Sequence, residues 1–456
     1  MNLATTERYR ETAAKALSDP ILKQALKGLQ DRLGKGALEA YRHLPEGEGL
    51  RHLAHDIRMN HVEHLDVLLD TLSRNIEARG GKVFFASDAA SAAEYVVQLA
   101  RRQGVRSVVK GKSMTSEEVG INAALEAEGI EVTETDLGEF IIQLAGESPS
   151  HIIAPAIHKT RQDIGRLFES KLGIPFTDDP PTLTRAARNH LRARFLSADM
   201  GITGCNLACA ETGQIALVSN EGNIRMATTL PRIHVAIMGM ERVCATIDEQ
   251  LLLLRLLSRG ASAQKMGGYV SFLAGPRREG FYDGPEEFHV IVLDNGRSRI
   301  LADPVFREVL CCIRCGGCLN VCPVYARIGG HSYGYAYCGP IGAVVTPLLT
   351  DIERSKHLFC GETLCGACKD VCPVAVDLPR MLLALRQVLA EGSPRWNVRP
   401  KPSFERFGYD IWAWVMTHPK AYQALLHGMR ALWPLLRRLP VPGWTPYREL
   451  PRTFGG

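Results

Sequence analysis

The cysteines between residues 311 and 372 are the part of this chain whose spacing could do chemistry. Ten of the 13 cysteines lie there. The first group, over residues 312–323, is C-x2-C-x2-C-x3-C-P, the spacing of bacterial ferredoxins. The second group, over residues 365–373, reads C-x2-C-x3-C-P. One C-x-x-C could be a zinc knuckle or a redox pair. Two sets that both end in Val-Cys-Pro instead predict a pair of [4Fe–4S] clusters.

The spacing also assigns the thiolates to the two clusters. In this ferredoxin pattern, the last cysteine of each group binds the cluster held mainly by the other group. The first cluster is therefore assigned to Cys312, Cys315, Cys318 and Cys372. The second cluster is assigned to Cys322, Cys365 and Cys368, and it needs one more ligand.

The fourth ligand of the second cluster is where the pattern breaks. A regular repeat would place a cysteine at position 362, but this residue is Glu362. Cys360 is the nearest substitute and Cys338 is the second candidate. If neither binds, the site could hold a three-iron cluster or a labile fourth iron. Cys311 is one residue out of frame, and we interpret it as a spare thiol beside the site.

The overall composition is that of an ordinary globular protein. The chain has 456 residues, 46% hydrophobic and 23% charged, with a net charge of +5, and its length suggests about two to four domains. This mild charge, without a basic run interleaved with aromatics, does not indicate nucleic-acid binding. The clustered cysteines indicate metal ligation rather than a disulfide framework. Because metal thiolates must stay reduced, we expect a cytoplasmic protein, without a signal peptide or a transmembrane helix.

The first 80 residues are expected to be helical. Ser18-Asp19-Pro20 is a helix cap with proline at the first helical position, and apolar residues follow at helical spacing as far as Gly34 and Gly36. A second helix is expected over residues 50–79. It carries His52, His55, His61 and His64, which we interpret as polar residues on an exposed or interface face rather than as a metal site.

Residues 82–300 alternate short apolar runs with helical runs, at residues 88–102 and 113–129 among others. This alternation predicts an α/β fold with a largely parallel sheet covered on both faces. The expected strands are residues 82–86, 106–110, 130–133, 151–154, 214–218, 234–238, 269–273 and 288–293. In such folds ligands bind at the carboxyl ends of the strands.

Polar loops at these strand ends suggest a small anion pocket. Residues 110–113 look like the end of a P-loop, but Arg106 stands where its first glycine would be, so they are not a Walker A motif. Lysines and free backbone N–H groups still meet there at a helix start. Residues 220–223 read equally well as a turn or as a pocket wall. The candidate pocket residues are Lys110, Lys112, Ser113, Glu211, Thr212 and Gly213. Cys205 and Cys209 are interpreted as structural thiols or as thiols that support a neighbouring site.

The end of the chain differs in composition. After Cys372, residues 376–389 form an amphipathic helix that closes the ferredoxin unit, and residues 392–395 read as a linker. All five tryptophans follow: Trp396, Trp412, Trp414, Trp433 and Trp444. Residues 424–438 are apolar on one side, with arginines on the other. Such a helical tail could dock on a partner protein, pack on its own domain or touch a membrane surface peripherally.

Three functions remain open from the residues alone. The first is an electron-transfer subunit rather than an enzyme in its own right, because clusters carry single electrons and offer no site for hydride or proton abstraction. The second is an α/β-domain enzyme or binding protein for a phosphorylated or CoA-linked small molecule, with structural clusters. The third is a redox- or iron-sensing interaction module. No flavin or nicotinamide fingerprint is present, so a hydride acceptor would come from a partner.

Longer motifs in the α/β segment resemble a known family. Residues 112–118, 134–147, 151–159, 201–206, 211–213, 219–223 and 228–231 are similar to those of lactate utilization protein B. The resemblance implies a lactate-utilization (LUD) domain, similar to the NagB/RpiA/CoA-transferase-like fold, before an α-helical ferredoxin domain. It also implies a role in oxidising L-lactate to pyruvate together with two other proteins. One would be a cysteine-rich, CCG-repeat protein, and the other a smaller protein with only the LUD domain.

The resemblance and the composition together divide the chain into four parts. They are N-terminal helices (1–80), the α/β LUD domain (81–296), the [4Fe–4S] ferredoxin domain (297–392) and the Trp-rich helical segment (393–456).

Overall fold

The structure, a computed structural model, describes residues 7–400 and 403–436. The chain forms two compact units, residues 1–387 and 388–456, which are described separately. Arg437, Arg438 and Trp444, which the sequence assigned to the tail, lie outside the described residues.

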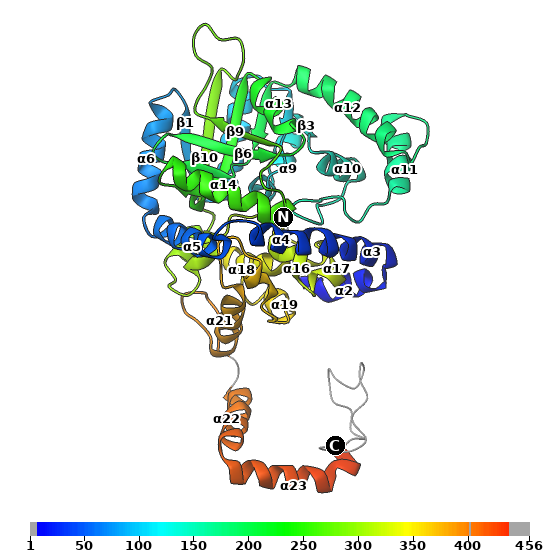
Figure 1. Ribbon diagram of the computed structural model, residues 1–456, viewed down its shortest axis with the longest axis vertical. Coiled ribbons are helices and arrows are strands. Elements are labelled where there is room, and N and C mark those ends of the chain that lie inside the picture. The colour runs from blue at the N-terminus through cyan, green and yellow to red at the C-terminus, as the bar shows by residue number, and fades with distance from the viewer. Residues whose placement is uncertain (1–6, 401–402, 437–456) are drawn as a thin grey trace. The chain divides into compact units, whose positions relative to one another are not determined.

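A six-stranded, entirely parallel sheet forms the centre of the first unit (Figure 1). Its order is β1 (Lys82–Ala86), β10 (Glu287–Leu293), β7 (Ile233–Gly239), β4 (Met200–Thr203), β2 (Ser107–Lys110) and β3 (Glu131–Glu134). A second, mixed sheet of four strands has the order β8 (Val243–Cys244), β5 (Leu207–Cys209), β6 (Gln214–Ser219) and β9 (Tyr269–Leu273). The prediction of an α/β fold with a large parallel sheet is therefore confirmed.

Both faces of the parallel sheet are buried, because alternate residues of each strand pack into different cores. Ile291 and Leu293 pack against one group of helices: α7 (Ala89–Arg102), α8 (Met114–Val119) and α9 (Ile121–Glu126). Val290 and Val292 pack on the other face, against α6 (Leu65–Glu77) and the four-stranded sheet. The same face is covered near β2 by α10 (Leu137–Ala145), α11 (Arg161–Leu172), α12 (Pro180–Ser197) and α13 (Asn223–Thr229).

The helix α14 (Ile247–Ser262) covers the four-stranded sheet. Gln250 of this helix donates a hydrogen bond of 3.0 Å to the Leu207 carbonyl of β5. The elements that lead from the sheets to the cysteines are η2 (Met240–Arg242), α15 (Arg297–Leu301) and η3 (Arg307–Cys311).

The cysteine-rich segment forms short helices joined by loops. They are α16 (Gly317–Val321), α17 (Tyr325–Ile328), η4 (His331–Tyr333), α18 (Gly339–Leu349), α19 (Lys356–Cys360), α20 (Ala367–Asp370) and α21 (Leu378–Glu391). The first helices of the chain pack on this segment, as Figure 1 shows for α2–α4 beside α16 and α17. These are α2 (Tyr9–Ser18), α3 (Pro20–Leu29), the π-helix η1 (Gln30–Gly34), α4 (Lys35–Arg42) and α5 (Gly47–Glu63).

Several expected element boundaries were wrong, each for a local reason. Residues 151–154 do not form a strand, because the His151 ring accepts hydrogen bonds from the backbone N–H groups of Ile153 and Ala154 and bends the chain. The helix expected over 50–79 breaks at His64. The helix expected over 113–129 breaks at Gly120, whose φ is +72°.

Gly34 does not end the first long helical run either. The chain continues through η1 into α4. A Cβ at position 34 would lie only 2.6 Å from the carbonyl oxygen of Asn320 in α16. Glycine at this position therefore permits close packing against the cysteine-rich segment.

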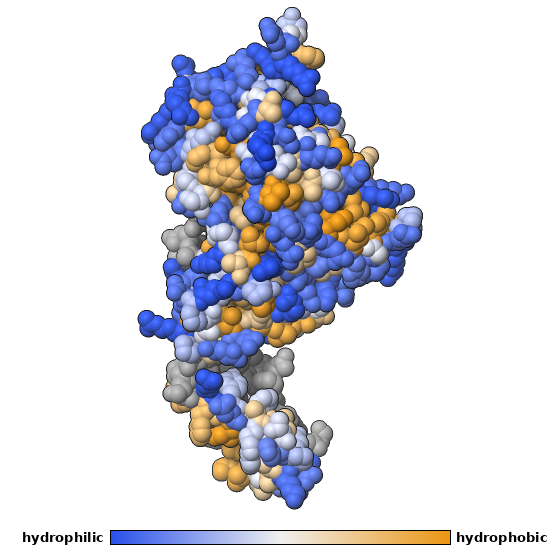
Figure 2. Space-filling view, turned by 90° about the vertical axis from the view of Figure 1, so that its left-hand side faces the viewer, coloured by the Kyte–Doolittle hydropathy of each residue, from blue (hydrophilic) through white to orange (hydrophobic). Residues whose placement is uncertain are grey.

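The second unit contains α22 (Ser403–Thr417) and α23 (Pro419–Leu436), which contact each other. Its large apolar side chains are mostly exposed, Trp412 and Trp414 among them, and hydrophobic residues appear on the surface of its helices in Figure 2. Within the described residues, no helix combines the length and apolar character that crossing a membrane requires.

Candidate iron–sulfur site and adjoining cavity

The two cysteine loops share one backbone conformation. Arg314 and Gly316, on either side of Cys315, have φ values of +57° and +77°. Leu364 and Gly366, on either side of Cys365, have φ values of +57° and +86°. A short helix follows each loop, α16 in the first and α20 in the second. Residues 312–323 and 362–373 are therefore a structural repeat.

Backbone N–H groups point at four of the cysteine sulfurs. The donors and acceptors are Arg314 to Cys312 at 3.3 Å, Gly317 to Cys315 at 3.4 Å, Tyr325 to Cys322 at 3.4 Å and Val376 to Cys372 at 3.3 Å. Such hydrogen bonds favour the thiolate, and in iron–sulfur proteins they tune the reduction potential. These loops thus fit an iron–sulfur cluster, whose iron atoms bind thiolates.

The structure gathers Cys312, Cys315, Cys318 and Cys372 into one group. Burial raises the pKa of Cys372 to about 12, and the nearby charge of Cys312 contributes to this rise. Burial, Cys372 and Cys312 raise the pKa of Cys315. Burial, Cys312 and Cys315 raise the pKa of Cys318. Neutral thiols in this group must lose their protons when they bind iron.

A second group consists of Cys322, Cys365, Cys368 and Glu362. Burial, Glu362 and Cys365 raise the pKa of Cys368 to about 12, and burial and Glu362 raise that of Cys322. All four side chains line one small cavity. The helices α16 and α20, which carry Cys318 and Cys368, contact each other, so the two groups adjoin.

The two cysteines considered for the open ligand position lie elsewhere. Cys360 is exposed at the end of α19. Cys338 is buried, with its sulfur 4.0 Å from the carbonyl oxygen of Ser150. Neither is among the described residues that line the cavity with Cys365 and Cys368. Cys311 is buried, and its sulfur lies 3.3 Å from that of Met59.

No group of three or more His, Cys, Asp or Glu side chains in the described ranges is arranged to hold a metal ion. A cluster requires a wider arrangement than a single ion, because its thiolates bind different iron atoms. Of the histidines near the N-terminus, His61 is buried, with Nε2 2.9 Å from Glu249.

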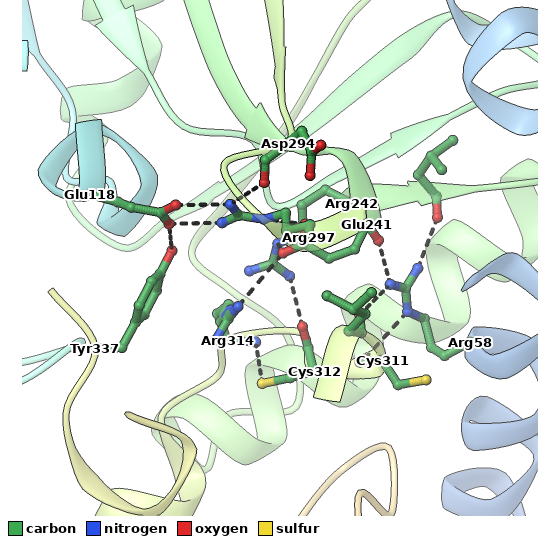
Figure 3. A network of polar contacts seen from close by, with 12 residues as sticks. Arg58, Glu118, Glu241, Arg242, Asp294, Arg297, Cys311, Cys312, Arg314 and Tyr337 are labelled. Carbon is green, nitrogen blue, oxygen red and sulfur yellow. Dashed lines mark hydrogen bonds and ion pairs between the residues drawn. The ribbon is translucent and has the colours of Figure 1, made fainter. Parts of the chain in front are cut away.

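A buried network of charges joins the sheet domain to the first cysteine loop (Figure 3). Arg297 donates two hydrogen bonds of 2.8 Å to Glu118 and one of 2.8 Å to Glu241. Arg314 lies 3.7 Å from the other carboxylate oxygen of Glu241. Arg242 donates to the carbonyl oxygen of Cys312 at 3.4 Å. Burial alone would raise the pKa of Glu241, but Arg297, Arg314 and Arg242 lower it to about 2.

Arg58 extends this network to the N-terminal helices. Its guanidinium donates to the backbone carbonyls of Leu310 at 3.0 Å, Val243 at 2.8 Å and Glu241, as Figure 3 shows. Sequence reasoning missed these arginines because their partners are far away in the chain. The only feature of the sequence that could have indicated these arginines is the position of Arg314 between two cysteines of the motif.

A cavity of about 290 Å³ lies between the carboxyl ends of the parallel strands and the first cysteine loop. Lys112 and Ser113 after β2, Gly204 after β4 and Glu241 after β7 line one side, and Arg314 and Cys315 line the other. Arg314 has a nitrogen, Nη1, that is buried and has no hydrogen-bond partner. Its guanidinium stacks over Tyr337, 4.4 Å from the ring centre.

The residues of the predicted anion pocket do not come together in this cavity. Lys112 and Ser113 line it, together with Asn220, Glu221 and Asn223. Residues 220–223 bend the chain from β6 into α13, so they form a wall of the cavity and not a hairpin turn. Lys110 is completely buried, with Nζ 2.8 Å from Glu134 and 3.0 Å from Glu117. A neutralised, enclosed lysine of this kind is not placed to meet an incoming anion.

The remaining three pocket residues, Glu211, Thr212 and Gly213, lie in the turn between β5 and β6. Glu211 accepts a hydrogen bond of 3.0 Å from the backbone of Ile247 at the start of α14. A Cβ at position 213 would lie 2.7 Å from the backbone of Asn75. This turn therefore packs between α6 and α14. Cys209 belongs to β5 and is buried, and Cys205, just before β5, lines the cavity.

Comparisons with known proteins identify two segments of the chain. Residues 69–293 match the LUD domain model, and residues 308–376 match the 4Fe-4S dicluster domain model. Lactate utilization protein B of Shouchella clausii is 44% identical over 455 residues, covering 97% of this chain and 94% of its own. Lactate utilization protein B of Anoxybacillus flavithermus is 46% identical over 404 residues, covering 88% and 85%. An uncharacterized electron transport protein, YkgF of Escherichia coli, is 42% identical over 455 residues, covering 98% and 94%.

With this identity along nearly the whole length of its relatives, the chain belongs to the lactate utilization protein B family of LUD-domain iron–sulfur proteins.

Proposed function

We propose that this protein is the electron-transfer subunit of a system that oxidises L-lactate to pyruvate, and that it carries two [4Fe–4S] clusters. The observation that carries the proposal is the pair of adjoining cysteine groups in one repeated loop. Bound clusters would accept and pass on single electrons. The names of the relatives supply the link to lactate and to electron transport.

The chain's own residues hold the clusters and control their surroundings. Cys312, Cys315, Cys318 and Cys372 hold the first cluster, while Cys322, Cys365 and Cys368 hold most of the second. The four N–H groups that point at sulfur stabilise negative charge there, and the short helices around the loops limit access of water. Both effects set reduction potentials in iron–sulfur proteins.

Two partner proteins complete the proposed system: a cysteine-rich, CCG-repeat protein and a protein with only the LUD domain. The five tryptophans fall in the tail, where α22 and α23 expose large apolar side chains. We assign this tail to partner docking, with peripheral contact to a membrane surface as the alternative. Because thiolate-bound clusters need a reducing compartment, the proposed location is the cytoplasm.

The test is reconstitution from anaerobically purified chains. This chain alone should contain about eight iron atoms, show dithionite-reducible [4Fe–4S] EPR signals, and give little lactate-dependent dye reduction. Adding both partners should restore turnover, and removal of residues 403–456 should leave the clusters intact while weakening partner binding. Robust lactate oxidation by this chain alone would refute the subunit role. Stoichiometric zinc in place of iron would refute electron transfer.

A second function is supported by the cavity beside Cys315. A buried guanidinium nitrogen without a partner is costly, and Arg314, a residue of the cavity wall, has such a nitrogen in Nη1. We therefore propose that the cavity binds a small organic anion, whose carboxylate or phosphate would accept from Arg314. The volume of about 290 Å³ suits a small metabolite.

Calorimetry with lactate, pyruvate, a sugar phosphate and CoA distinguishes the candidate anions. The variant Arg314→Gln should weaken binding of the preferred anion at least about tenfold, since a charged hydrogen bond contributes about 1.5–3 kcal/mol. Arg101→Gln, in an exposed ion pair with Glu128, is the matched control. No binding by any of the four anions, or equal binding by the Arg314 variant, would remove this second function.

A further inference from the structure

The second cluster still lacks a fourth ligand, and the structural repeat shows which residue occupies that position. Cys315, Cys318 and Cys322 of the first loop correspond to Cys365, Cys368 and Cys372 of the second. By the same correspondence, Glu362 takes the place of Cys312. We propose that the carboxylate of Glu362 is the fourth ligand of the second cluster, binding iron through oxygen where the first cluster has sulfur. This inference rests on the proposed pair of clusters.

The carboxylate already lies with the other three ligands. Glu362 lines the same small cavity as Cys322, Cys365 and Cys368. Its Oε2 lies 3.5 Å from the sulfur of Cys322. The side chain of Glu362 therefore reaches the place at which the thiolates converge.

The carboxylate of Glu362 is buried and its orientation is fixed. Glu362 is only 8% exposed. Its Oε1 accepts a hydrogen bond of 3.0 Å from the buried hydroxyl of Tyr333, and its Oε2 accepts one of 3.5 Å from the thiol of Cys322. Burying a charged carboxylate is expensive unless it is paired or coordinates a metal. Coordination to iron would remove this cost, and the tyrosine fixes which oxygen is presented.

The backbone around position 362 is held from outside the loop. Arg386 of α21 donates to the carbonyl oxygen of Glu362 at 2.7 Å and to that of Phe359 at 2.8 Å. The left-handed conformation of Leu364 and Gly366 repeats that of the first loop. The carboxylate is thus presented by a fixed backbone, as Cys312 is.

The cysteines nearest to this position do not compete for it. Cys360 precedes Glu362 by two residues but is not among the described residues that line the cavity with Cys365, and Cys338 lies against Ser150. A carboxylate is a harder and less electron-donating ligand than a thiolate. The iron bound to Glu362 should therefore be the one lost first on oxidation, which leaves a [3Fe–4S] cluster held by three thiolates.

Metal analysis and EPR of four variants test the assignment. The wild-type chain should contain about eight iron atoms, and Glu362→Ala about seven, with a [3Fe–4S] signal in the oxidised sample. Glu362→Cys should regain about eight, with slower loss of the fourth iron in air. The controls Cys360→Ser and Cys338→Ser should match the wild type. In protein labelled with 13C-glutamate, ENDOR should detect a hyperfine coupling between a carboxylate carbon and the electron spin of the reduced second cluster. This coupling should be absent in Glu362→Cys.

The outcomes separate this inference from the proposed function. If the wild type contains both [4Fe–4S] clusters and Glu362→Ala has the same iron content and EPR signals, Glu362 is not a ligand. The proposed electron-transfer role would then be unaffected. Loss of iron in Cys360→Ser or Cys338→Ser would also refute the assignment of Glu362, as would a wild type that contains a [3Fe–4S] cluster when it is purified anaerobically and has not been exposed to air. The EPR signal of the first cluster and the far-UV CD spectrum show whether a variant is folded. If Glu362→Ala fails this check, the ENDOR measurement on wild-type protein decides alone.

Discussion

Replacing Arg297 with methionine should destabilise the protein far more than the same change at the surface. Arg297 is 1% exposed and Glu118 is completely buried, and two parallel hydrogen bonds of 2.8 Å join them. A third bond of 2.8 Å reaches Glu241. Removing one partner of a buried ion pair leaves uncompensated charge and typically costs about 3–5 kcal/mol. We expect a loss in this range for Arg297→Met.

Arg101→Met is the matched control. Arg101 also forms two hydrogen bonds to one carboxylate, that of Glu128, but its side chain is 62% exposed. Exposed pairs contribute about 1 kcal/mol or less. Adding Glu118→Gln to Arg297→Met should recover part of the stability, because the side chain that loses its cationic partner is then neutral, while Glu241 still lies beside Arg314.

The assay is anaerobic urea unfolding followed by far-UV CD and by the visible absorbance of the clusters. Tryptophan fluorescence would not report on this site, since all five tryptophans follow residue 395. The network joins the sheet domain to the cysteine loop, so both signals should shift together. A midpoint for Arg297→Met no lower than that for Arg101→Met would refute the reasoning that burial sets the magnitude.

The loss of stability in Arg297→Met should also depend on pH. In the wild type, burial opposes ionisation of Glu118 and Glu241, but Arg297 keeps the pKa of both below the ordinary 4.5. Their contribution to stability is therefore present above about pH 4.5 and is lost below it. Without Arg297, burial raises the pKa of Glu118, whereas Arg314 and Arg242 still lower that of Glu241. The folded variant therefore binds an extra proton on Glu118 and gains stability relative to the wild type as the pH falls. The difference between variant and wild type should narrow from pH 7.5 to pH 5.5.

Three further predictions concern other parts of the first unit. Gly201→Ala should cost about 1–3 kcal/mol or more, because its Cβ would lie 1.8 Å from the carbonyl oxygen of Ala227. In contrast, Gly28→Ala, in open space on α3, should add about 0.5–1 kcal/mol in the same urea assay. Burial and Arg58 lower the pKa of His61 to about 4, and burial and His289 lower that of His234 to about 3. The unfolded chain therefore binds more protons, and the free energy of unfolding should fall as the pH drops below about 6.5. A flat profile between pH 7.5 and 5 would contradict this. Removing iron with a chelator should speed proteolysis within residues 9–34, since α2, α3 and η1 pack on the cysteine-rich helices. An unchanged cleavage rate, measured by mass spectrometry, would show that these helices do not depend on the clusters.

The parallel sheet was predictable because its strands are buried on both faces. Runs such as residues 235–238 and 290–293 are continuously apolar, which short amphipathic strands are not. The sequence did not distinguish the strands of the four-stranded sheet from those of the parallel sheet. The runs at β6 and β9 are also apolar, but these two strands pair antiparallel. The strand expected at 151–154 shows the limit of this approach. A run of apolar residues favoured a strand, but hydrogen bonds to the His151 ring decided the backbone.

Of the candidate site, the cysteine loops were predictable, because the spacing of their cysteines is a local feature of the sequence. The cysteines of each loop are close in sequence, so their pattern alone indicated cluster loops. The cavity was not predictable in this way, because it joins strand ends to a loop far away in the chain. Of the predicted anion pocket, Lys112 and Ser113 reach the cavity, whereas Lys110 turns to Glu134. Lys110 is the last residue of β2, whereas Lys112 and Ser113 lie in the loop that leads to α8. The course of such a loop depends on residues far away in the chain and is not set by the local pattern.

Arg314 explains why the cysteine loops and the sheet domain form one compact unit. Its φ of +57° is unfavourable for a residue with a side chain, at a cost on the order of 1–3 kcal/mol. This backbone turns the N–H of Arg314 toward the sulfur of Cys312, while its side chain reaches Glu241 after β7. The strained conformation that places a cluster thiolate is thus stabilised by a carboxylate from the sheet domain. Leu364, which has the same φ in the second loop, brings no such charge. The first cysteine loop, unlike the second, therefore depends on the strand ends for its geometry, and Arg314 and Cys315 of this loop border the cavity.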